Sequence, residues 1–253
     1  MNLLKQWVKS FMQIMFPCHC AVCGDLLGGE ECGICTRCFS SLPFTNIHGS
    51  RGNWFERYCW GQLPIHRASS FLKYLTSTDS RSPFVSMKYR NRPDLGELFG
   101  FLMAKELADT DFFSQIDYIV PIPLSEERFR QRGYNQSTAL ARGISKVTGI
   151  PIREDLVIRT VSNISQTTLT TAERHENVKN IFEYVGGDVV NDPHILLVDD
   201  IFTTGSTMFS CAKALSQISG ISFSIIVLGI SRQYPYNQSL DNINTEDPLS
   251  PIS

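Results

Sequence analysis

One stretch of the sequence decides the fold, and it reads Ile195-Leu196-Leu197-Val198-Asp199-Asp200-Ile201-Phe202-Thr203-Thr204-Gly205-Ser206-Thr207. The four apolar residues 195–198 predict a strand that is buried on both faces. Two adjacent carboxylates end this strand, and a loop rich in hydroxyl groups follows them. A helix then begins near Ser206. A strand, a turn and a helix in this order form the repeating unit of an α/β fold.

The side chains of this stretch have the chemistry of a sugar-phosphate site. Carboxylates at the end of a strand can accept hydrogen bonds from the two neighbouring hydroxyl groups of a ribose. The loop N–H groups, the threonine hydroxyls and the helix N-terminus suit a phosphate monoester. A P-loop is excluded because the Gly-Lys-Ser/Thr ending is absent, and an EF-hand is excluded because it needs acids at alternate positions. The predicted ligand residues are Asp199, Asp200, Thr203, Thr204, Gly205, Ser206 and Thr207.

Strands and helices alternate on both sides of this stretch. We expect further strands at 118–120, 157–160, 182–185 and 221–230, and helices at about 95–107, 135–148 and 206–217. Asn135 is a predicted N-cap and Gly149 closes the same helix. No element could be assigned between residues 47 and 82. The pattern predicts a parallel α/β sheet.

The composition is that of a globular chain. It has 253 residues, 42% of them hydrophobic, which excludes a wholly disordered protein. The formal net charge of -2 excludes a uniformly basic nucleic-acid coat and leaves a local basic patch open. No run of about eighteen apolar residues occurs, so the sequence predicts no membrane span.

The cysteines are concentrated near the N-terminus. Six of the eight lie between Cys18 and Cys38. No signal-peptide pattern precedes them, so we expect a reducing, cytoplasmic compartment in which clustered cysteines bind metal. Two C-x-x-C pairs predict a structural four-thiolate zinc site at Cys20, Cys23, Cys35 and Cys38. Cys32 forms a competing pair with Cys35, and Cys18 and His19 are alternative ligands.

The two ends of the chain have different characters. Residues 1–16 carry apolar side chains at helical spacing, which predicts a helix packed on the protein, with peripheral contact to the inner face of a membrane as the alternative. From Tyr234 the chain is polar and predicts a disordered tail. We therefore expect an N-terminal helix and zinc-binding module at 1–58, an α/β domain at 59–233 and a tail at 234–253.

The 195–207 stretch resembles the phosphoribosyl-pyrophosphate signature of type I phosphoribosyltransferases. Together with the cysteine pairs, further motifs make the chain resemble the ComF family of competence proteins, of the ComFC type, over roughly residues 14–230. These motifs are Val120-Pro121-Ile122-Pro123, Arg128, Arg132-Gly133-Tyr134-Asn135-Gln136, Leu140-Ala141-Arg142, Gln166, Leu169, Arg174, Asn177 and Phe182. Thr168 departs from the pattern, because relatives often have glycine there.

The resemblance implies a phosphoribosyltransferase-like sheet flanked by helices and preceded by a zinc module. It implies that the two acids bind the ribose hydroxyls of phosphoribosyl pyrophosphate, that the loop holds the 5-phosphate and that Mg²⁺ assists at the pyrophosphate. It also implies a role in natural transformation, with incoming single-stranded DNA and other competence proteins as partners.

Two cationic clusters could meet the phosphates of DNA. The first consists of Arg128, Arg130 and Arg132, and the second of Lys88, Tyr89, Arg90 and Arg92. The first cluster could instead meet the phosphates of the ligand, and ordinary solvated loops are the alternative for both. The sequence shows no residues that would recognise the acceptor substrate of a phosphoribosyl transfer. A phosphoribosyltransferase acting on an unidentified acceptor, and a ligand-sensing regulator without transfer activity, therefore stay open as alternative functions.

Overall fold

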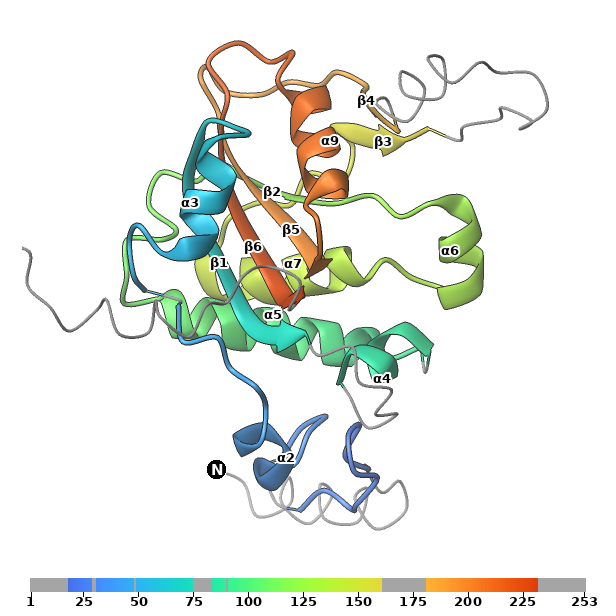
Figure 1. Cartoon of the computed structure of the whole chain (residues 1–253). Helices are drawn as coiled ribbons and strands as arrows, with labels where there is room; N and C mark the ends of the chain where they lie inside the picture. The colour runs from blue at the N-terminus through green and yellow to red at the C-terminus, as the bar shows by residue number, and fades with distance from the viewer. Residues whose placement is uncertain are drawn as a thin grey trace, which may run out of the picture.

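The computed structural model describes residues 18–28, 31–47, 49–74, 83–89, 91–160 and 181–231 (Figure 1). The predicted N-terminal helix at 1–16 and the predicted tail at 234–253 lie outside these residues. The same holds for the motif residues Gln166, Leu169, Arg174 and Asn177, and for Thr168 and Arg90.

Parallel strands form the centre of the structure. The helices are α2 (Thr36–Ser40), α3 (Trp54–Trp60), α4 (Pro83–Tyr89), α5 (Pro93–Leu107), α6 (Glu126–Arg132), α7 (Gln136–Thr148) and α9 (Ser206–Leu215). The strands are β1 (Ile65–Tyr74), β2 (Tyr118–Pro121), β3 (Val157–Arg159), β4 (Phe182–Tyr184), β5 (His194–Phe202) and β6 (Ser222–Ser231). The main sheet has the order β1-β6-β5-β2 with every pair parallel, and β3 and β4 form a separate antiparallel pair.

Side chains of β5 alternate between two hydrophobic layers, as a strand buried on both faces requires. Leu196 and Val198 pack in the layer that contains α5 and α7. Ile195 and Leu197 pack in the opposite layer, with residues of α3 and α9. The arrangement of the helices on the two sides of the sheet is visible in Figure 1. The predicted parallel α/β fold is confirmed.

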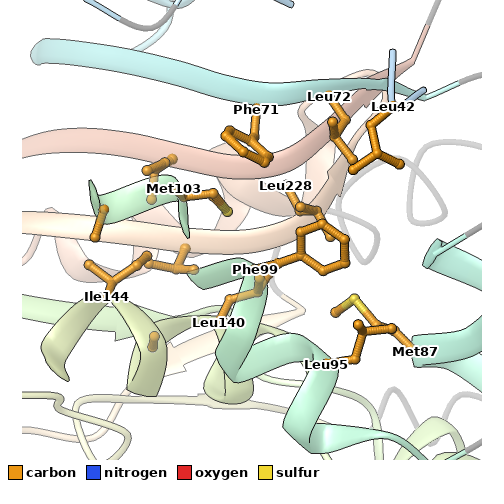
Figure 2. Close-up of a cluster of buried hydrophobic side chains, with 14 of the residues drawn as sticks. Leu42, Phe71, Leu72, Met87, Leu95, Phe99, Met103, Leu140, Ile144 and Leu228 are labelled. Atoms are coloured by element: carbon orange, nitrogen blue, oxygen red, sulfur yellow. The ribbon is translucent and has the colours of Figure 1, made fainter. Parts of the chain in front are cut away.

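Helices α5 and α7 cross at backbone contact distance. A Cβ atom added at Gly100 would overlap the carbonyl oxygen of Leu140, and one added at Gly143 would overlap that of Glu97. Only glycine permits such an approach. The side chains around the crossing, including Phe99 and Met103, fill the space between these helices and the sheet (Figure 2).

Strand β1 escaped prediction because it carries polar residues that are buried. Arg67 is 5% exposed, and its guanidinium pairs with the carboxylates of Glu56 and Asp111. Ser69 and Ser70 are also buried. A strand with charge and hydroxyl groups inside has no apolar run or alternation for a sequence pattern to detect.

One predicted element boundary is wrong, and one helix lies where a solvated loop was the alternative. Strand β5 does not end before the carboxylates but runs to Phe202, because Asp199 and Ile201 still pair with Val227 and Gly229 of β6. Residues 126–132 form helix α6 rather than a solvated loop. The Ser125 hydroxyl caps this helix by accepting from the N–H of Arg128, and Gly133 ends it at a φ of 76°.

The cysteine-rich segment packs on the outer side of α5. A Cβ atom at Gly33 would touch Leu95 and Leu98 of that helix. Cys20, Cys35 and Cys38 belong to the same hydrophobic layer as α5. The division of the chain at residues 58 and 59 stays a prediction, and α3 spans that position.

Replacing Gly100 by alanine tests the helix crossing. Alanine normally favours a helix interior by about 1 kcal/mol over glycine. Here the new methyl group meets the backbone of α7, so we expect a loss of roughly 3 kcal/mol in the free energy of unfolding, at the upper end of overpacking effects. Urea unfolding measures it. Gly61→Ala is the control, because a Cβ atom there meets nothing within 4 Å. Equal stability of Gly100→Ala and wild type would contradict the crossing.

Candidate functional site

Asp199 sits where β5 meets the start of α7. Its Oδ1 atom accepts the hydroxyl of Ser137 at 2.9 Å and the backbone N–H of Asp200 at 2.8 Å. Burial and the neighbouring carboxylate of Asp200 raise the pKa of Asp199 to about 7, against the lowering effect of these hydrogen bonds. The pair therefore carries negative charge that the protein alone stabilises poorly.

The second carboxylate has an oxygen that lacks a hydrogen bond. Asp200 Oδ2 is buried without a hydrogen-bond partner, and Lys88 Nζ lies 3.5 Å from it as a salt-bridge partner. Gln136 Nε2 at the start of α7 is also buried without a hydrogen-bond partner. A buried polar group without a partner is uncommon in folded proteins and often marks a ligand position.

The loop after β5 carries hydroxyl groups that are exposed to solvent. Thr203, Thr204 and Ser206 are exposed, and the hydroxyls of Thr204 and Ser206 lie 2.7 Å apart. Gly205 is the N-cap of α9 at a φ of 76°, where a Cβ atom would overlap the rings of Phe202 and Phe209. Gly205 makes no side-chain cap of α9, and the N–H of Ser206 donates to Thr204 Oγ1 at 3.4 Å, a long hydrogen bond that an anion could replace.

The predicted ligand residues therefore follow one another along the end of β5 and the first turn of α9. Sequence reasoning missed the contribution of Ser137, Gln136 and Lys88 to this site. Asn135 and Gln136 belonged to a recognised motif, but their proximity to β5 depends on the α5–α7 crossing. Lys88 was assigned to a DNA surface, whereas the structure places it against Asp200.

The other predicted cations have varied partners. Arg130 pairs with Glu126, Arg92 with Asp94, and Arg132 donates to the amide oxygen of Gln136. Arg128 has no ion pair among the described residues. Burial and the nearby guanidinium of Arg128 lower the pKa of Arg159 at the end of β3. The two described cations of the second cluster, Lys88 and Arg92, are thus paired with acids, while the first cluster retains unpaired charge at Arg128 among the described residues.

The four predicted metal ligands are brought together. The sulfur atoms of Cys20, Cys23, Cys35 and Cys38 all lie within 4.8 Å of one another. Cys23 and Cys35 have their sulfur atoms 3.8 Å apart. A tetrahedral zinc ion with Zn–S bonds of about 2.3 Å requires an S···S separation of about 3.8 Å. The donor set therefore fits structural zinc and leaves no open coordination position.

Backbone N–H groups donate to two of the four sulfur atoms and favour their thiolate form, whereas burial raises the pKa of Cys38. The N–H of Cys35 donates to Cys20 Sγ at 3.3 Å, and that of Asp25 donates to Cys23 Sγ at 3.4 Å. Burial would raise the pKa of Cys20, but backbone N–H groups that donate to its sulfur outweigh burial and lower it to about 6.

The competing metal ligands are not part of the cluster. Cys18 and Cys32 are exposed free thiols outside the group of four. His19 Nδ1 lies 3.0 Å from the carbonyl oxygen of Gly24 and serves the turn that follows the first C-x-x-C pair. Cys59 and Cys211 are buried in the layer of α3 and α9.

Within the described residues, no helix combines the length and the apolar character needed to cross a bilayer.

The chain is similar in sequence to proteins named for competence and for DNA utilization. It is 27% identical to competence protein F of Haemophilus influenzae over 82% of this chain and 94% of the relative. It is 28% identical to the DNA utilization protein YhgH of Escherichia coli over 78% and 83% of the two chains. It is 34% identical to competence protein ComFC of Bacillus subtilis over 38% and 37%. The predicted resemblance to ComF proteins is confirmed.

No family model matches the chain. Solved structures similar to it include several named as phosphoribosyltransferases. One is an adenine phosphoribosyltransferase, with 19% identity over 62% of this chain and 79% of that one, and a TM-score of 0.37.

Replacing a predicted zinc ligand should remove the metal. Cys38→Ser should lose about one zinc ion per chain and lower the melting temperature, because metal binding contributes to folding free energy. Elemental analysis of protein purified without added metal measures it. Cys32→Ser should keep the metal, since this thiol lies outside the cluster. Zinc retained in Cys38→Ser, or lost in Cys32→Ser, would refute the ligand set.

The raised pKa of Asp199 makes stability depend on pH. A carboxyl with a higher pKa when folded binds its proton more tightly in the folded state, so stability falls as pH rises from about 4 to about 7. Asp199→Asn removes this loss. At about pH 8 it should be more stable than wild type by at least about 1 kcal/mol, and at about pH 4 the two should match.

Urea unfolding at the two pH values measures the effect. Asp109→Asn, which neutralises an exposed carboxylate, is the control and should show no such pH-dependent gain. A gain that is the same at both pH values would mean that titration of Asp199 is not its cause.

Proposed function

We propose that this relative of competence protein F acts in natural transformation or DNA utilisation by binding phosphoribosyl pyrophosphate and handling single-stranded DNA. The observation that carries the ligand assignment is the buried Oδ2 atom of Asp200, which has Lys88 as a salt-bridge partner but no hydrogen-bond partner, beside the start of α9, where the N-cap glycine has no side chain. The carboxylates of Asp199 and Asp200, which can accept hydrogen bonds from hydroxyl groups, begin the segment 199–207. The N–H and hydroxyl groups of residues 203–207, which can donate to a phosphate, end it. A ribose 5-phosphate presents the matching groups in the same order.

The individual residues have separable parts in this proposal. Asp199 and Asp200 accept the ribose hydroxyls, while residues 203–207 surround the 5-phosphate. Lys88 acts as counter-charge to the two acids. Mg²⁺ would arrive with the pyrophosphate and supply positive charge there, and the carboxylate oxygens nearby are donors of the hard type that this ion prefers.

The competence role rests on the names of the relatives. They include proteins named for competence and for DNA utilisation, and they match most of this chain. The zinc module serves as structural support in this proposal, because a four-thiolate set has no position for a reacting water. Phosphates of DNA would be met by the cations that have no acidic partner, Arg128 and Arg132.

The ligand assignment is tested by calorimetry with phosphoribosyl pyrophosphate and Mg²⁺. A hydrogen bond to a charged group contributes about 1.5–3 kcal/mol, so a single Asp200→Asn change should weaken binding roughly ten- to a hundredfold. The double change Asp199→Asn with Asp200→Asn should abolish it. The fold should survive, because two adjacent like charges are removed without loss of shape.

Asp109→Asn is the matched control and should bind like wild type. Wild-type affinity in the double variant would refute the site. The same double variant should abolish transformation in a competent host. Transformation that persists without ligand binding would show that the site is not needed for the competence role.

A further inference from the structure

A pocket of about 420 Å³ lies between α6 and the end of β2. Its walls are formed by residues at the end of β2 and after it, on α6, before α7 and after α7, namely Pro121, Pro123, Leu124, Glu126, Phe129, Arg130, Asn135 and Glu154. The volume lies within the range of small-ligand sites. None of the predicted ligand residues between Asp199 and Thr207 lines this pocket.

Helix α6 is held by local interactions rather than by packing. None of its residues is buried. The Ser125 cap, the Glu126–Arg130 ion pair at 2.9 Å and the Gln131–Glu127 hydrogen bond at 3.3 Å stabilise it from within. A short helix without a core face contributes little to stability, so its side chains are free to serve a surface. The helix extends away from the sheet in Figure 1.

Phe129 presents a ring to this pocket with 51% of its surface exposed. The remaining walls are two prolines and a leucine, the polar groups of Asn135 and Glu154, and the Glu126–Arg130 ion pair. A pocket with one aromatic wall, three apolar side chains and several hydrogen-bonding groups suits a flat heterocycle. A carboxylate accepts hydrogen bonds only, which matches the amino groups of nucleobases.

The charges of the same helix suit a phosphate backbone. Arg128 has no ion pair among the described residues, and Arg132 contacts only the neutral amide of Gln136 there. Arginines beside a stacking ring are the combination used to hold single strands, because phosphates take the charge and bases take the ring.

The pocket borders the proposed ligand site. Asn135 lines the pocket and donates to the carbonyl oxygen of Ile122 at 3.0 Å, while the N–H of Ile122 donates to Val198 of β5 at 2.9 Å. Two residues after Asn135, Ser137 donates to Asp199. A strand held at α6 would therefore lie next to the bound ribose phosphate.

We propose that this pocket receives one base of a single DNA strand, stacked on Phe129, with the adjacent phosphates at Arg128 and Arg132. The proposal rests on the DNA-handling part of the proposed function and names the surface that performs it.

The test uses the full-length protein and a fluorescent oligo-dC, with anisotropy as the measure of affinity. Loss of base stacking costs roughly five- to a hundredfold in affinity per base, so Phe129→Ala should weaken binding by that factor. Phe129→Leu keeps apolar volume without a π face and should recover little. Phe101→Ala is the matched control, because this ring is also exposed, lies on α5 and does not line the pocket.

A second readout isolates the base from the phosphates. A strand in which every base is replaced by an abasic site keeps its charge, so the wild type should bind it more weakly and Phe129→Ala should bind it no worse than the wild type does. A 2-aminopurine base in the strand should change its fluorescence on binding to wild type and not to Phe129→Ala.

The outcomes distinguish a failure of the pocket assignment from a failure of the proposed DNA-handling function. If wild type binds no oligonucleotide, the DNA-handling function and the pocket assignment both fail. If Phe129→Ala binds oligo-dC as tightly as wild type does, and wild type binds the abasic strand as tightly as oligo-dC, the DNA-handling function stands and the pocket assignment is refuted. If free cytosine or adenine occupies the pocket and oligonucleotides do not compete, the pocket is a small-molecule base site and the proposal is overturned.

Discussion

The close crossing of α5 and α7 is the constraint on which both candidate sites depend. Glycines at positions 100 and 143 let the two backbones touch, since any side chain there would overlap a carbonyl oxygen of the other helix. The crossing fixes where α7 begins, and its first turn supplies Ser137 to Asp199. The outer side of α5 then remains for the cysteine module, which packs on Leu95 and Leu98. One contact between helices thereby positions two functional regions that share no residue.

The proposed ligand site contains two adjacent, largely buried carboxylates, Asp199 and Asp200, which destabilise the folded protein. Two carboxylates follow each other in a strand, and the burial of Asp199 together with the repulsion from Asp200 raises the pKa of Asp199. One lysine at 3.5 Å offsets this only in part. Arrangements of this kind are typical of functional sites, because the missing stabilisation is supplied when the ligand binds. In the proposed function, a magnesium ion and the ribose hydroxyls would offset this repulsion and supply the hydrogen bond that Asp200 Oδ2 lacks.

The sequence predicted those parts of the structure that are encoded locally. The apolar run of β5, the Asn135 cap of α7 and the two C-x-x-C pairs each determine their structure within a few residues, and all are found. Strand β1 was missed because the partners that make Arg67 acceptable inside the protein, Glu56 and Asp111, are distant in sequence. The role of Lys88 was missed for the same reason, since nothing near it predicts contact with Asp200.

Helix α4 links the cysteine module to the ligand site through three consecutive residues. The hydroxyl of Ser86 donates to the carbonyl oxygen of Ala21, between the first two metal ligands. The carbonyl oxygen of Met87 accepts the hydroxyl of Tyr134 at 2.6 Å. Lys88 then faces Asp200. A helix of seven residues is too short to be stable alone, so its position is set by these contacts. The cysteine module therefore helps to hold the cation that balances the carboxylate pair, and this is a reason for a small metal-binding module to be retained beside a sheet that already has its own core.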